Sequence, residues 1–307
     1  APLTFELQLG ASSTATADDF DEMNVTVDVM ALAGADGVSA GELFNVISVV
    51  ADNIVEEDEL ARLQLVNPGS GVALDPDADE VDYTLLNDDV LTVGFSKSSY
   101  QFTAGTAPDA GDALGLTVTG AELDANSPNI SVDFTNTEVT AVLGTHYESD
   151  NQTIQLPKFD FEQPGNQFIA FDDDDSNLQF RVISNNRVHF GKTLALALTD
   201  NSEYVTLDGS ADDANITILT DNQLTVRFAD SSYTFTEGDA VDEADRVGFT
   251  VTGGELDLDA GDTLSFSIDF IDGTAEQGAG QDYTSDNQLI ELANNTGYDN
   301  TFVPLDA

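Results

Sequence analysis

The sequence predicts an all-β protein built from tandem β-sandwiches. Apolar residues alternate with polar ones in Leu264–Phe270 (LSFSIDF) and Asn215–Leu219 (NITIL), which is the period of a strand with one buried face. Clusters of Gly, Asp and Asn interrupt these runs at short intervals, as turns do in sandwiches. No window shows a sustained helical period.

An internal repeat divides the chain into modules. The segment Leu91–Phe95 (LTVGF) matches Leu224–Phe228 (LTVRF), and the offset of their central residues is 226 − 93 = 133. The same offset carries Val49 onto Val182. We therefore expect a partial module at 1–89, a complete module at 90–222 and a second partial module at 223–307. A module of about 130 residues has an ordinary domain size.

The charge of the chain limits its partners. It carries 58 acidic and 8 basic residues, a formal net charge of −50. Nucleic acids and anionic membranes would be repelled, so neither is an expected partner. Repulsion among these acids destabilises the folded chain unless bound divalent cations or a salty medium offset it. Adaptation to a halophilic cytoplasm is an alternative explanation of the acidic composition, but it would not place acids at particular spacings.

Further absences narrow the possible chemistry. The chain has no Cys, which removes disulfides and thiolate chemistry. No apolar stretch approaches the roughly 20 residues that span a bilayer, and residues 1–20 show no signal-peptide pattern. We expect no membrane insertion in this segment, and any export signal or anchor would lie outside it.

Ordered motifs resemble one known family. Tyr233–Asp239 (YTFTEGD), then FTVTGG, Asp272–Ala275 (DGTA) and Gln281–Tyr283 (QDY) resemble the opening half of a Calx-beta domain. Val49–Glu59 (VVADNIVEEDE) and Thr84–Asp89 (TLLNDD) resemble its closing half. The resemblance implies tandem seven-stranded antiparallel, immunoglobulin-like sandwiches with incomplete first and last modules. It also implies Ca²⁺ at one end of a sandwich, between loops and the exit strand.

The resemblance assigns Ca²⁺ ligands in two modules. In the first module they are Asp52, Ile54 through its carbonyl, Glu56, Glu59, Asn87, Asp88 and Asp89. In the third module they are Glu237, Asp272 and Asp282, whereas Asp269 is expected to face solvent. Ser12 stands where the first module should carry the Asp of DGTA. Ca²⁺ takes six to eight oxygen ligands, mainly carboxylates. A solvated acidic loop is the alternative interpretation.

The middle module departs from the ligand pattern. Its matching residues are Asn185, Arg187, His189 and Lys192 in place of Asp52, Ile54, Glu56 and Glu59, and Ala104, Asn136 and His146 in place of Glu237, Asp272 and Asp282. We expect a lost ion site in which cationic side chains neutralise Asp221. Arg187 and Lys192 argue against a transition metal at His146 and His189. The run Asp172–Asp175 is interpreted as a solvated loop, with weak surface Ca²⁺ as the alternative.

The sequence favours a structural role over catalysis. It has no nucleophile elbow, and repeat position accounts for its acids and both His residues. We expect a Ca²⁺-stiffened structural or adhesive segment of a large extracellular or cell-surface protein, from a bacterial and marine or saline setting. Its partners would be neighbouring modules, identical subunits, or cell-surface and matrix ligands. One alternative is a filament subunit assembled by strand complementation between incomplete modules; another is a Ca²⁺-dependent glycan-binding module.

Overall fold

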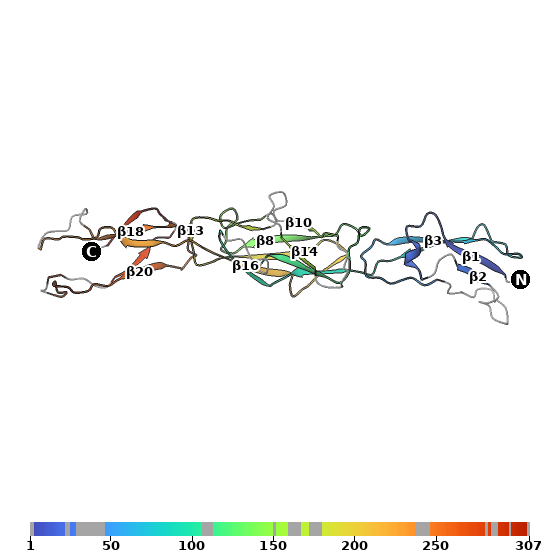
Figure 1. The fold of residues 1–307 in the computed structure, drawn as a ribbon, viewed down its shortest axis with the longest axis horizontal. Coiled ribbons are helices and arrows are strands. Elements are labelled where there is room, and N and C mark those ends of the chain that lie inside the picture. The colour runs from blue at the N-terminus through green and yellow to red at the C-terminus, as the bar shows by residue number, and fades with distance from the viewer. Residues whose placement is uncertain are drawn as a thin grey trace.

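The computed structural model describes residues 3–21, 25–28, 47–105, 113–149, 152–158, 167–171, 180–237, 246–279, 282–283, 288–294 and 296–305. These residues form an elongated, β-rich molecule with its termini toward opposite ends (Figure 1). We call residues 1–89 unit 1, residues 90–222 unit 2 and residues 223–307 unit 3. The three units follow one another along the long axis (Figure 1).

Unit 1 contains one described sheet, in the order β2-β1-β3-β4. Its elements are β1 (Thr4–Leu9), the 3₁₀ turn η1 (Ala17–Asp19), β2 (Val25–Asp28), β3 (Glu59–Val66) and β4 (Glu80–Leu85). Neighbouring strands are antiparallel. Alternation in β3 buries Ala61 and Leu63, and Ala61 packs with Ala15 and Phe20 in a small core.

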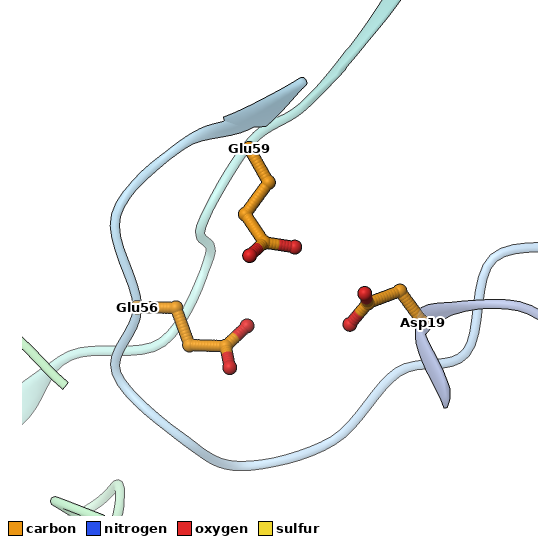
Figure 2. A group of neighbouring side chains, drawn as sticks. All are labelled: Asp19, Glu56 and Glu59. Carbon is orange, nitrogen blue, oxygen red and sulfur yellow. The ribbon is translucent and has the colours of Figure 1, made fainter. Parts of the chain in front are cut away.

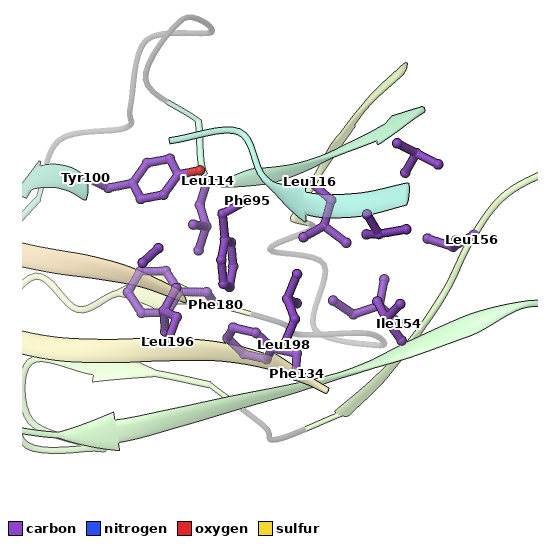
Figure 3. Close-up of a cluster of buried hydrophobic side chains, with 14 of the residues drawn as sticks. Phe95, Tyr100, Leu114, Leu116, Phe134, Ile154, Leu156, Phe180, Leu196 and Leu198 are labelled. Carbon is purple, nitrogen blue, oxygen red and sulfur yellow. The ribbon is translucent and has the colours of Figure 1, made fainter. Parts of the chain in front are cut away.

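Unit 2 is a sandwich of two main sheets, ordered β10-β8-β14-β16-β6 and β11-β7-β5-β15. Its strands are β5 (Leu91–Phe95), β6 (Ser99–Thr103), β7 (Gly115–Thr119), β8 (Ser131–Glu138), β9 (Tyr147–Glu148), β10 (Gln152–Gln155), β11 (Gln167–Ala170), β12 (Arg181–Val182), β13 (Arg187–Val188), β14 (Lys192–Asp200), β15 (Val205–Leu207) and β16 (Asp213–Leu219). Period-2 alternation explains the packing: Leu194, Leu196 and Leu198 of β14 all point into the core. Phe95, Phe134 and Leu116 meet them between the sheets (Figure 3).

The predicted all-β sandwich is confirmed, but its pairing is not antiparallel throughout. β15 runs parallel to β5, and β16 runs parallel to β6. The chain enters unit 2 from unit 1 and leaves it toward unit 3 at the opposite end (Figure 1). Its first and last strands therefore run in the same direction, and any pairing between them has to be parallel.

Unit 3 contains the sheet β17-β18-β23 and the two-stranded sheet β20-β21. Its strands are β17 (Thr225–Phe228), β18 (Gly248–Thr252), β19 (Gly254–Leu256), β20 (Leu264–Ile268), β21 (Gln288–Leu292), β22 (Gly297–Tyr298) and β23 (Thr301–Pro304). Val251, Leu256 and Tyr298 form the centre of its core. Among the described residues, no helix is long and apolar enough to cross a membrane.

The two joints between units share one backbone pattern. At the joint of units 2 and 3, which we call the second joint, β13 pairs in parallel with β19, with Arg187 opposite Glu255. At the joint of units 1 and 2, the first joint, Ile54 forms a parallel bridge with Glu122. Both partners are shifted by the repeat, since 187 − 54 = 133 and 255 − 122 = 133.

Backbone hydrogen bonds fix each joint. At the first joint, the Glu122 amide donates to the Asn53 carbonyl at 2.7 Å, and the Val55 amide donates to the Glu122 carbonyl at 3.0 Å. Val55 is fully buried and belongs to the core of unit 2. At the second joint, a Cβ on Gly254 would lie 2.4 Å from the carbonyl oxygen of Asn186, so only glycine allows this approach.

Candidate metal centre

The ligands predicted in the first module gather at the first joint. An open hollow of about 330 Å³ lies there. Its lining includes all seven of them, Asp52, Ile54, Glu56, Glu59, Asn87, Asp88 and Asp89, together with Asp19. Residues separated by more than 30 positions in the sequence therefore face one space at the end of unit 1.

Three carboxylates form the centre of this hollow. Asp19, Glu56 and Glu59 each offer an oxygen, and these atoms lie within 4.8 Å of one another. Asp19 ends η1, Glu56 lies on the loop before β3, and Glu59 begins β3 (Figure 2). All three side chains point toward a common space (Figure 2). A donor set made only of oxygens suits Ca²⁺, which prefers carboxylates and tolerates mixed loop ligands.

Asp19 was missed by the sequence prediction. Phe20 forms a β-bridge with Val49, and Tyr147 pairs in the same way with Val182, the repeat counterpart of Val49. Phe20 and Tyr147 are therefore equivalent, and so are the residues before them, Asp19 and His146. The spacing between them is 146 − 19 = 127 residues, six fewer than the repeat offset. An acid or His directly before an aromatic residue, as in Asp19-Phe20 and His146-Tyr147, was the available signal.

Hydrogen bonds hold the Asp19 side chain and the loop that carries Glu56 in place. Oδ2 of Asp19 accepts from the amide of Thr16 at 2.5 Å and from its hydroxyl at 3.0 Å, which completes a capping box. Asn87 connects the loop to the segment that leads into β5: its Oδ1 accepts from the Glu56 amide at 3.0 Å, and its Nδ2 donates to the Asp89 carbonyl at 2.8 Å. These hydrogen bonds fix the Asp19 carboxylate and the loop that carries Glu56.

The acids of the first joint repel one another. Burial, followed by the charges of Asp52, Glu59, Asp19 and Asp124, raises the pKa of Glu56 to about 7. Burial and Asp19 also raise the pKa of Glu59. A divalent cation among these groups would remove the repulsion.

The second joint places cations at the equivalent positions. Lys192, the counterpart of Glu59, is buried, and its Nζ lies 3.1 Å from Oδ1 of Asp257 and 2.6 Å from Oδ1 of Asp259. Nη1 of Arg187 lies 3.1 Å from both Oδ2 of Asp257 and Oε1 of Glu255. Burial raises the pKa of Asp257, but Lys192 and then Arg187 outweigh it and hold the pKa of this carboxyl below its ordinary value.

Two buried His residues complete the second joint. Nδ1 of His146 accepts from the Val142 amide at 3.0 Å, so Nε2 carries the proton and donates to Oδ2 of Asp257, also at 3.0 Å. The ring of His189 lies edge-on to that of His146, with centroids 5.4 Å apart. Neither nitrogen of His189 has a hydrogen-bond partner among the described residues. Burial, then His146 and Lys192, lowers its pKa to about 4.

The structure corrects one prediction about this network. The cations of the second joint were expected to neutralise Asp221, but they pair with Asp257, Asp259 and Glu255. Asp221 is exposed and accepts from Nδ2 of Asn222. The counter-charges therefore come from the following unit, and the ion pairs join unit 2 to unit 3.

The ligands predicted in unit 3 are placed in exposed segments. Oδ1 of Asp272 accepts from the Tyr283 hydroxyl at 2.6 Å, and Oδ2 of Asp282 accepts from the Glu276 amide at 3.0 Å. Glu237 is exposed and lies on a different loop. Within the described part of the chain, only the first joint brings three acidic ligand atoms together. Asp172–Asp175 lies outside the described residues.

Comparisons with known proteins give weak likenesses. No family model matches the chain, and no curated protein matches it. A solved structure of the Calx CBD1 domain in its apo form is similar over 43% of this chain and 98% of its own, with 18% identity and a TM-score of 0.32. The CBD12 structure from CALX1.2 is similar over 71% of this chain and 86% of its own, with 16% identity and a TM-score of 0.27. Superpositions this loose do not assign the chain to a family.

Proposed function

We propose that this chain is a Ca²⁺-dependent structural segment in which an ion bound at the first joint stiffens the connection between units 1 and 2. The observation that carries the proposal is the cluster of Asp19, Glu56 and Glu59, whose ligand atoms lie within 4.8 Å at a joint. The raised pKa of Glu56 supports the proposal, because no described residue places a compensating positive charge beside the cluster.

The residues around the hollow supply enough oxygens for Ca²⁺. Asp19, Glu56 and Glu59 would hold the ion from one side, and Asp52, Asp88 and Asp89 line the same hollow. The carbonyl of Ile54 is a further donor, as the family resemblance implies. When bound, the ion would supply positive charge that links the loop before β3 to the segment between β4 and β5. Asn87 already holds these two segments together through hydrogen bonds.

The second joint supports a mechanical role for the first. There the positions of Ile54 and Glu59 carry Arg187 and Lys192, which make ion pairs to unit 3. On this proposal, both joints would carry positive charge at the same position of the repeat, the second with fixed side chains and the first with an ion. We propose that the second joint is rigid without Ca²⁺, whereas the first depends on it.

The shape and the charge of the chain support a proposal about its wider role. Three units follow one another in an elongated chain (Figure 1), and a net charge of −50 suits a medium rich in cations. We propose a non-catalytic structural or adhesive role in an extracellular or cell-surface protein. Filament assembly by strand complementation, glycan binding and a bacterial marine source stay predictions.

Calorimetric Ca²⁺ titration of the whole chain tests this function, with Mg²⁺ as the control ion. Ca²⁺ should bind and raise the melting temperature, while Mg²⁺, which requires a stricter octahedral geometry, should do less. A melting curve that is the same in Ca²⁺ and in EGTA would refute the proposal.

A further inference from the structure

We infer that Asp124 of unit 2 is a counter-charge that attracts the Ca²⁺ ion of unit 1 from the other side of the first joint. This inference rests on the proposed function and extends it, because a single ion would then hold two units. The argument comes from comparing the joints, since Asp124 and Asp257 occupy the same repeat position (257 − 124 = 133).

Asp257 receives the positive charge of the second joint. Its carboxylate lies 3.1 Å from Nζ of Lys192, 3.1 Å from Nη1 of Arg187 and 3.0 Å from Nε2 of His146. The counterparts of these three residues in unit 1 are Glu59, Ile54 and Asp19, respectively. Glu59 and Asp19 belong to the carboxylate cluster. One acid of the following unit therefore faces the position at which unit 2 carries its fixed cations.

The backbone of the first joint brings Asp124 to the matching place. Glu122 exchanges hydrogen bonds with Asn53 and Val55, which lie just before Glu56. Asp124 lies two residues after Glu122, just as Asp257 lies two residues after Glu255 at the second joint. Asp124 does not line the hollow itself. It acts from the adjoining surface of unit 2.

The Asp124 carboxylate is fixed and remains ionised. Its Oδ1 accepts from the amides of Asn126 at 2.7 Å and Ser127 at 2.8 Å, and from the Ser127 hydroxyl at 3.1 Å. Although burial raises it, these hydrogen bonds hold the pKa of Asp124 below its ordinary value. Without an ion, the Asp124 carboxylate repels the carboxylates of unit 1. With a cation between Asp124 and those carboxylates, both sides are attracted to the cation, which draws the two units together.

The variant Asp124→Asn separates charge from structure. The amide keeps an oxygen that can accept from the Asn126 and Ser127 amides, so the turn at 124–127 is retained while its negative charge is lost. Asp213→Asn is the matched control, because it removes one charge from the exposed side of β16 in the same unit. Two readouts are needed: Ca²⁺ affinity by calorimetry, and the width of the distance distribution between spin labels in units 1 and 2.

We expect Asp124→Asn to weaken Ca²⁺ binding by several-fold, because the variant removes one negative charge that would attract the ion across the joint. Saturating Ca²⁺ should narrow the inter-unit distance distribution in the wild type and in Asp213→Asn, but less in Asp124→Asn. Wild-type affinity together with wild-type narrowing in Asp124→Asn would overturn the inference and leave the Ca²⁺ site intact. Failure of the wild type itself to bind Ca²⁺ would instead overturn the proposed function, and this inference with it.

Discussion

The two joints of this molecule have the same backbone and opposite chemistry. In each joint, a loop of one unit pairs in parallel with residues of the next, at positions shifted by 133. The first joint presents Asp19, Glu56 and Glu59 to one another, while the second presents Lys192 and Arg187 to Asp257. The comparison teaches that one backbone pairing can carry opposite charges, and we propose that these charges set the conditions under which each joint is rigid.

Loss of the buried cation at the second joint should have the largest effect. Lys192→Met keeps the length of the side chain but leaves Asp259 without its 2.6 Å partner. Breaking a buried ion pair from one side costs about 3 kcal/mol or more. Urea unfolding should show this loss equally with and without Ca²⁺, and Lys97→Met, at an exposed lysine of the same unit, should unfold almost as the wild type does. A loss that Ca²⁺ repairs would contradict the account of this joint.

Removal of carboxylates from the first joint should abolish stabilisation by Ca²⁺. For the wild type, free Ca²⁺ at 100 times its dissociation constant adds about 2.7 kcal/mol to the free energy of unfolding. Glu56→Ala combined with Asp88→Ala should remove most of that increment, as measured by melting in Ca²⁺ and in EGTA. The same two changes should slightly stabilise the chain in EGTA, because they relieve repulsion. A full Ca²⁺ increment in the double variant would show that the ion binds elsewhere.

The pH dependence of the two joints should differ in sign. In the absence of Ca²⁺, the folded chain retains a proton on Glu56 up to about pH 7, whereas a Glu in the unfolded chain has a pKa of 4.5. The folded state then binds more protons than the unfolded state, so stability due to Glu56 falls as pH rises from 4.5 to 7. Glu56→Gln should flatten this part of the profile, and Ca²⁺ should also do so.

At the second joint, acid should be destabilising. The pKa of His189 falls from 6.5 to about 4 on folding, so the folded state binds fewer protons between these values. The contribution of neutral His189 to the free energy of unfolding is fully present above about pH 6.5 and is lost as pH falls toward 4. His189→Gln should reduce that loss in denaturation experiments from pH 4 to pH 7. An acid loss of unchanged size in this variant would assign the effect to other groups.

The sequence predicted the sandwich and the acidic wall of the hollow because both depend on local patterns. Alternation places Leu194 and Leu196 in the core, and the family resemblance identified Glu56 and Glu59 as candidate ligands. Asp19 was not predicted because the segment from Phe20 to Val49 in unit 1 is six residues shorter than its counterpart in unit 2. An offset of 133 therefore does not align Asp19 with His146.

Contacts between units were beyond what the repeat could show. The offset identified Lys192 as a replacement for an acid, but the choice of Asp257 over Asp221 depends on how unit 3 packs against unit 2. The parallel pairing of β15 with β5 likewise depends on the path of the chain through unit 2, and a sequence motif for a single strand contains no information about that path.

Distances measured across both joints of one chain test the central claim most directly. The chain has no Cys, so pairs of introduced cysteines can carry spin labels without background. Val81→Cys with Ser99→Cys spans the first joint, and Ser99→Cys with Ser265→Cys spans the second; all three positions are exposed on strands. Ca²⁺ should narrow the distance distribution across the first joint, while the second joint should be equally narrow in Ca²⁺ and in EGTA. An equal response of both joints to Ca²⁺, or no response of either, would contradict the account.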